Sequence, residues 1–61
     1  MNIPKDPIMM LSFVNTQLRD NYSSLSDLAK SFGEDENVII EKLAEVGYSY
    51  NVENNQFVRS V

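Results

Sequence analysis

The sequence predicts a small α+β domain, in which a three-helix, helix-turn-helix-like unit precedes a C-terminal β-hairpin. Apolar residues recur at the spacing of a helix face in three successive segments, and each segment starts at a good capping residue. After Gly47 the spacing changes to an alternation of apolar and polar residues, which is typical of strands. The chain has 61 residues, a length that supports one core, so we expect a single domain over 1–61.

The second predicted helix spans 24–32. Ser24 is a good N-cap because its hydroxyl can accept a hydrogen bond from a free N–H of the first turn. Gly33 ends the helix, since glycine readily adopts the left-handed conformation that follows many helices. Four residues between these ends have the spacing of a buried stripe, namely Leu25, Leu28, Ala29 and Phe32.

The third predicted helix spans 35–46, from the N-cap Asp35 to the residue before Gly47. The spacing of Ala29, Gly33 and Ile39 is that of a helix-turn-helix, with a small residue, a turn glycine and an aliphatic residue. This spacing is common in pairs of short helices that meet at a steep angle, so a structural helix pair is the simpler interpretation. The broad apolar face of this helix comprises Ile39, Ile40, Leu43, Ala44 and Val46.

The first predicted helix spans 7–20 and follows an N-terminal arm, 1–6. Asp6 and Pro7 form a helix start, because the carboxylate can cap and proline suits the first helical position. Ile3 is expected to pack against the body of the protein. One inward stripe comprises Met10, Leu11, Val14 and Leu18.

Met9 and Phe13 form a second apolar stripe on the first helix, with Ile8 between the two stripes. One packing face does not need this much apolar surface. The second stripe either packs beneath the hairpin, which would enlarge a small core, or stays exposed as a surface for a partner or a homodimer. We expect the first arrangement and retain Met9 and Phe13 as the candidate partner surface.

The predicted hairpin spans 48–59, with a two-residue turn at Asn54 and Asn55, since asparagine tolerates positive φ. This register pairs Val52 with Phe57, Tyr50 with Arg59 and Tyr48 with Val61. The apolar face, which must lie on the helices, then comprises Tyr48, Tyr50, Val52, Phe57 and Val61. Three helices followed by a hairpin is the element order of a minimal winged helix.

The composition excludes several kinds of chemistry. The sequence has neither cysteine nor histidine, so disulfides, zinc sites and imidazole-based catalysis are excluded. The densest carboxylate cluster is 34–36, where a helix start already favours acidic residues. A domain this small should leave little room for a pocket of about 300 Å³ or more. We therefore expect no cofactor and no enzymatic activity.

The formal net charge of −4 disfavours nucleic acids and anionic membranes as partners. If the third helix read DNA, Asn37 and Lys42 would contact the bases, but four glutamates lie in the same region. No apolar run approaches the roughly 20 residues that span a bilayer, and the start lacks the pattern of a signal peptide. We expect a cytoplasmic protein without a membrane partner.

Two parts of the chain resemble a known family. Residues 1–7 and 10–20 resemble the opening, and 41–50 and 54–58 the closing part, of the small bacterial proteins grouped as domain of unknown function 4250. The resemblance covers nearly the full chain. It implies a stand-alone bacterial protein of about this length with no assigned activity. The family supplies no catalytic or binding residues that could be transferred.

The sequence favours a non-catalytic protein-interaction or regulatory module. The Met9 and Phe13 stripe supports this interpretation, since methionine-rich apolar surfaces adapt to partners. The alternative is a DNA-binding helix-turn-helix or winged-helix protein, which the acidic third helix makes less favourable.

Overall fold

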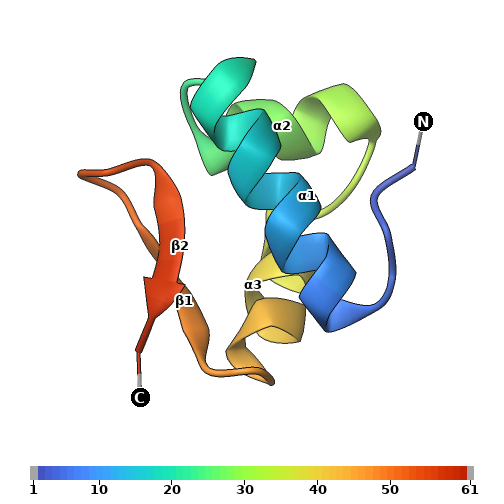
Figure 1. The fold of residues 1–61 in the computed structure, drawn as a ribbon. Coiled ribbons are helices and arrows are strands. Elements are labelled where there is room, and N and C mark those ends of the chain that lie inside the picture. The colour runs from blue at the N-terminus through green and yellow to red at the C-terminus, as the bar shows by residue number, and fades with distance from the viewer. Residues whose placement is uncertain (1, 61) are drawn as a thin grey trace.

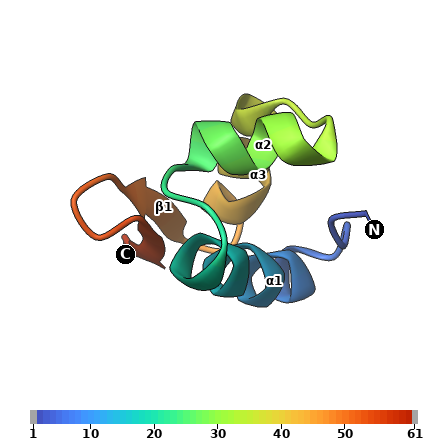
Figure 2. The same ribbon diagram turned by 90° about the horizontal axis from the view of Figure 1, so that it is seen from above.

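The computed structural model describes residues 2–60 and has three helices followed by a two-stranded antiparallel sheet. The predicted α+β class and element order are confirmed (Figure 1). The N-terminal arm and the tip of the hairpin lie on opposite sides of the helices in Figures 1 and 2. The elements are α1 (Pro7–Asp20), α2 (Leu25–Phe32), α3 (Glu36–Ala44), β1 (Tyr48–Asn51) and β2 (Gln56–Arg59).

The three helices start at the residues that the sequence indicates. The Asp6 carboxylate accepts from the N–H groups of Ile8 and Met9, each at 3.1 Å. Ser24 Oγ accepts from the N–H three residues further on at 3.1 Å, and the Asp35 carboxylate accepts from the N–H two residues further on at 2.9 Å. Each cap satisfies backbone donors that have no partner inside the helix.

The ends of α2 and α3 differ. Gly33 ends α2 in the left-handed conformation, at φ 68°, as predicted. The sequence predicts that the third helix reaches residue 46, but it ends at Ala44. The N–H groups of 45–47 bond to carbonyls three residues earlier, which tightens the chain into a 3₁₀-type turn before β1. Ala44, which the sequence places on the broad apolar face of this helix, is exposed in the structure.

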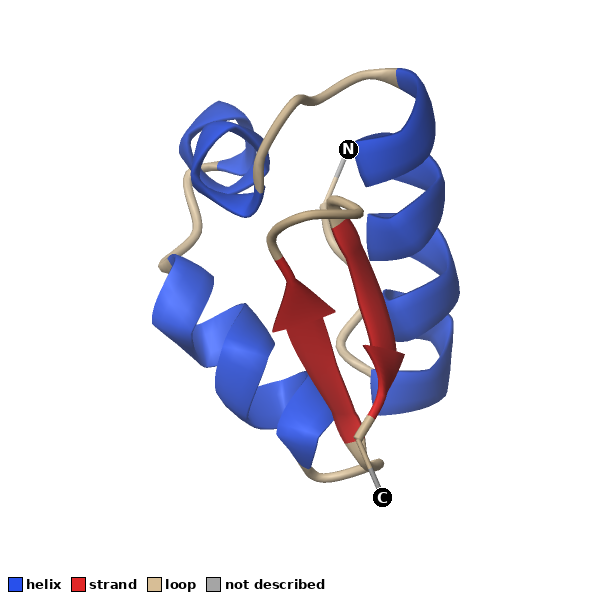
Figure 3. Ribbon diagram, turned by 90° about the vertical axis from the view of Figure 1, so that its left-hand side faces the viewer, coloured by secondary structure: helices blue, strands red, loops and turns tan. Residues whose placement is uncertain are grey.

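The core lies where the helices, the N-terminal arm and the hairpin converge. Ile3 of the arm is 8 % exposed, which confirms that it packs against the body. The hairpin contributes Phe57, and its two strands lie beside α1 and α3 (Figure 3). The other buried residues are Met10, Val14, Leu18, Leu25, Leu28, Ala29, Ile39 and Leu43.

The hairpin occupies its predicted range, but its register differs by two residues from the predicted one. Phe57 lies opposite Tyr50 rather than Val52, and Arg59 lies opposite Tyr48 rather than Tyr50. A shift of two preserves the face on which each side chain lies, because side chains alternate with a period of two. Tyr48, Tyr50 and Phe57 therefore still share one face.

The register differs because the turn contains four residues, 52–55, instead of two. Asn51 Oδ1 accepts from Asn54 N–H at 3.0 Å, and Asn55 N–H bonds to the Val52 carbonyl at 3.3 Å. Asn55 is the only non-glycine residue of 2–60 with positive φ, at 52°. A two-residue hairpin turn of type I′ would need positive φ at both central residues. Val52 therefore lies in the turn and is 78 % exposed. Val61, the predicted partner of Tyr48, lies outside the described residues.

Asn15 of α1 binds the outer edge of β2. Phe57 N–H donates to Asn15 Oδ1 at 2.8 Å, and Asn15 Nδ2 donates to the Phe57 carbonyl at 3.1 Å. Gln56 Nε2 donates to the Asn15 backbone carbonyl at 3.1 Å. One amide side chain thus pairs with both backbone groups of Phe57, as a neighbouring strand would.

Asn55 ties the hairpin turn to two helices. Its Nδ2 donates to the carbonyls of Leu18, at 3.0 Å, and Tyr22, at 2.9 Å. Its Oδ1 accepts from the Tyr50 hydroxyl at 2.6 Å, and that hydroxyl accepts from Leu25 N–H at 3.2 Å. The turn thus supplies partners for the end of α1 and for a donor at the start of α2.

Phe13 lies on the side of α1 that faces away from the hairpin. Residues two apart on a helix are rotated by about 200°, and Asn15 faces β2. The Phe13 ring contacts Phe32 of α2, with ring centres 5.6 Å apart in an edge-to-face arrangement. The expectation that the second stripe packs beneath the hairpin is therefore wrong for Phe13, which packs against α2.

Replacement of Asn15 tests how the hairpin is held. Asn15→Ala leaves the N–H and carbonyl of the buried Phe57 without their partner, so we expect a loss of about 1–3 kcal/mol in unfolding free energy. Urea unfolding followed by circular dichroism measures it. Thr16→Ala, an exposed neighbour on α1, is the matched control. Equal stability of the two variants would contradict the anchoring role.

Two substitutions of Asn55 separate its conformation from its hydrogen bonds. Asn55→Gly tolerates the positive φ but loses three side-chain hydrogen bonds, and should cost about 1–3 kcal/mol in unfolding free energy. Asn55→Ala should cost about 1 kcal/mol more, because alanine is strained at positive φ. Asn54→Ala is the control in the same urea titration. A glycine variant as stable as the parent would show that the hydrogen bonds contribute little.

Candidate functional site

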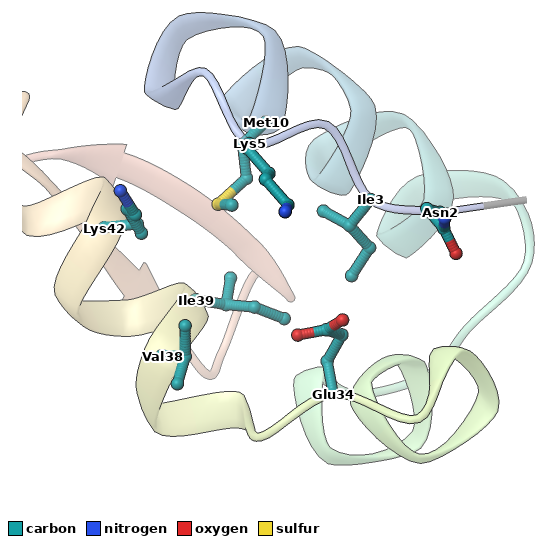
Figure 4. Close-up of a pocket in the computed structure, with 8 residues that line it drawn as sticks. All are labelled: Asn2, Ile3, Lys5, Met10, Glu34, Val38, Ile39 and Lys42. Carbon is teal, nitrogen blue, oxygen red and sulfur yellow. The ribbon is translucent and has the colours of Figure 1, made fainter.

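A cavity of about 420 Å³ opens between the N-terminal arm, α1, the turn after α2, and α3 (Figure 4). The arm, held by the buried Ile3, forms one wall, and the start of α3 lies across the gap from it. Its size lies in the range of small-molecule and side-chain binding sites, roughly 300–1,000 Å³. The expectation that so short a chain leaves little room for a pocket is therefore wrong.

The apolar part of the cavity comes from three elements. Ile3 of the arm, Met10 of α1 and Ile39 of α3 are each buried, at 1–8 % exposed, and line the inner part. Val38 is 45 % exposed and lines the opening. The helical spacing predicts Val38 on the polar side of the third helix, where a lone valine has no core role. In the structure, this exposed valine lines the same cavity as the apolar residues Ile3, Met10 and Ile39.

Charged side chains line the rest of the cavity. Lys5 and Glu34 come from opposite sides, and Figure 4 shows the ammonium of one and the carboxylate of the other directed toward the space between arm and helix. Lys42 lies further along α3, and Asn2 lies on the arm. The salt bridge found within residues 2–60 joins Arg19 to Asp20, so it uses none of these three charges. They are therefore available to a bound group.

Sequence reasoning missed this cavity because its walls are far apart in the chain. Lys5 and Lys42 are separated by 37 positions, and no local period relates them. The one relevant signal in the sequence is Ile3, an apolar residue in the arm, which indicates that the arm packs on the body but does not indicate a cavity.

The structure separates the two residues of the predicted partner surface. Met9 is 62 % exposed, as is its neighbour Ile8. Phe13 is half-buried against Phe32, and its ring belongs to the packing between α1 and α2. The partner role of these residues stays a prediction, but it now concerns the exposed start of α1, at Ile8 and Met9.

The two residues of the predicted nucleic-acid face lie on different sides of α3. Residues five apart on a helix are rotated by about 140° from one another. Asn37 is exposed and shares its side with Glu41 and Glu45, four and eight residues on. Lys42 is half-buried and lines the cavity instead. The exposed side of α3 thus offers one amide among carboxylates.

The acidic cluster before α3 serves the helix start. Asp35 is the N-cap and Glu36 lies in the first turn. Within residues 2–60, acidic side chains form no group of three that could hold a metal ion. At the end of α1, hydrogen bonds from the Arg19 guanidinium lower the pKa of the Asp20 carboxyl, and the same contact raises the pKa of Arg19. Both residues of this pair are exposed, and neither lines the cavity.

The structure is a small α+β domain with an open cavity whose lining is partly apolar and partly charged. The sequence model of the family described as "Domain of unknown function (DUF4250)" matches residues 4–57 of the 61. The chain therefore belongs to this family, as its opening and closing segments indicate. No curated protein and no solved structure matches the chain. Every helix within residues 2–60 is too short or too polar to cross a bilayer.

Titration with a generic DNA duplex tests the acidic face of α3. We expect the ¹⁵N–¹H amide signals of 37–45 to stay unchanged at low salt, because Glu41 and Glu45 repel phosphates. The double variant Glu41→Lys, Glu45→Lys is the comparison, since it should acquire salt-sensitive shifts if charge is the barrier. Salt-sensitive shifts in the parent protein would contradict this prediction and favour the DNA-binding alternative.

Proposed function

We propose that this chain is a non-catalytic protein-interaction module, and that it binds an apolar side chain of its partner in the cavity between the N-terminal arm and α3. The observation that carries the proposal is the cavity itself, with its buried inner wall of Ile3, Met10 and Ile39 and its charged opening. An apolar wall supplies affinity, and charges at the rim select the partner and orient it.

The charges at the opening favour a partner segment that combines an apolar residue with an acidic one. Lys5 and Lys42 contribute two positive charges, against one negative charge from Glu34. The chain as a whole has a net charge of −4, whereas lysines outnumber carboxylates among the residues that line the cavity. An acidic residue beside the inserted side chain would be attracted to the lysines and repelled elsewhere on the surface.

Two other functions have weaker support. For DNA binding, the exposed side of α3 lacks the positive charge that phosphate contacts need. For catalysis, the cavity brings together an amine and a carboxylate, but the chain supplies neither a histidine nor a cysteine as a nucleophile or proton-transfer group. The proposed role is therefore binding without catalysis, and a cytoplasmic location remains part of this proposal.

Selection from a random peptide library tests the proposal and requires no identified partner. Random heptapeptides displayed on phage are selected on the immobilised protein, and selected peptides are titrated into ¹⁵N-labelled protein. We expect apolar-acidic peptides that shift the amides of Lys5, Glu34 and Val38. Val38→Asp should weaken binding at least about tenfold, because a carboxylate would have to be desolvated at the apolar opening.

Met9→Asp is the matched control, since Met9 is at least as exposed as Val38 but lies on α1 outside the cavity lining. Selected peptides that bind Val38→Asp as well as the parent would overturn the proposal. Peptides that lose binding to Met9→Asp instead would move the interaction to the start of α1.

A further inference from the structure

The tip of the hairpin presents an apolar side chain that the fold does not use. Val52 is 78 % exposed, the highest value among the large apolar residues of 2–60. Turns favour glycine, proline, asparagine, aspartate and serine for conformational reasons, and a β-branched residue gains nothing there. The next residue, Glu53, is also exposed. The tip therefore displays one apolar side chain next to one carboxylate.

The tip is held in a defined shape before any partner binds. Asn51 closes the turn from one side, at 3.0 Å to Asn54 N–H. Asn55, the last residue of the turn, is fixed by side-chain hydrogen bonds to Leu18, Tyr22 and Tyr50. A preorganised loop loses little conformational entropy on binding, which favours association.

The tip and the cavity are complementary and lie on opposite sides of the molecule. Val52 matches the apolar wall that Val38 and Ile39 provide, and Glu53 matches the positive charge of the lysines. Figures 1 and 2 both place the hairpin tip on the side opposite the N-terminal arm. A tip therefore cannot reach the cavity of its own chain, but it can reach that of a second copy.

We propose that the partner of the cavity is a second copy of this chain, whose hairpin tip inserts Val52 while Glu53 pairs with Lys5 or Lys42. The inference rests on the proposed function. The contact joins two different surfaces, so it is heterologous and leaves a free tip and a free cavity at the ends of each assembly. A tip in a cavity forms a small interface, below about 1,200 Å², so the association is weak and reversible.

Sedimentation velocity with two complementary variants tests this arrangement. The parent protein is measured from about 10 μM to about 1 mM, the range in which small interfaces associate. Val52→Asp removes the inserted side chain, and Val38→Asp blocks the cavity opening. Both residues are exposed, so both variants should fold, which circular dichroism verifies. Met9→Asp is the control for a homodimer through α1.

We expect the average mass of the parent to rise with concentration beyond that of a dimer, and Met9→Asp to behave like the parent. Val52→Asp alone and Val38→Asp alone should each remain monomeric. An equimolar mixture should form dimers and stop there, because one variant contributes an intact cavity and the other an intact tip. In that mixture, ¹⁵N-labelled Val52→Asp should show shifted amides at Val38 and Ile39.

A parent protein that is monomeric throughout, or a mixture that forms no dimer, would overturn the inference. Loss of association in Met9→Asp with retention in Val52→Asp would overturn it as well. If the parent is monomeric but selected peptides still bind the cavity, the proposed function stands and the self-association falls. If the selected peptides also fail to bind the cavity, both the proposed function and the self-association are contradicted.

Discussion

The attachment of the hairpin to the helices through two asparagine side chains is the constraint on which the rest of this structure depends. A two-stranded hairpin is marginally stable by itself in water, and among the described residues Phe57 is the one that the hairpin contributes to the buried core. Asn15 pairs with the backbone of Phe57, and Asn55 joins the turn to Leu18 and Tyr22. These polar contacts place Phe57 against the helices, and burial of its ring then stabilises the fold of the chain.

The same contacts determine which side chains of the hairpin are exposed to solvent. Asn55 reaches the Leu18 carbonyl from a four-residue turn, and in this turn Val52 lies outside the strand. The register that satisfies the backbone therefore exposes an apolar side chain at the tip. Tyr50 connects this turn to the start of α2, so a change at the tip would also affect the helix pair.

The N-terminal arm has the corresponding role on the other side of the molecule. Ile3 anchors it in the core, and the chain between Ile3 and α1 then forms one wall of the cavity with Lys5. Since the arm has neither helix nor strand, its position depends on this apolar anchor and on the Asp6 cap that follows. The short arm thus adds a cavity to the helix-turn-helix-like unit.

By itself the sequence determined the features that depend on near neighbours in the chain. Capping residues such as Asp6, Ser24 and Asp35 located the helix starts, Gly33 located a helix end, and alternation located the strands. These signals act within a few residues and do not depend on how the helices pack. The family resemblance over most of the chain was also visible at this level.

Tertiary structure decided the hairpin register, the place of Phe13 and the existence of the cavity. Asn15 and Asn55 select the register through partners 33–42 positions away, which no local pattern encodes. Phe13 packs on Phe32 because the angle between α1 and α2 brings the rings together. The cavity unites residues of the arm with those of α3. Contacts between distant segments depend on how the elements pack, and a one-dimensional period carries no information about that packing.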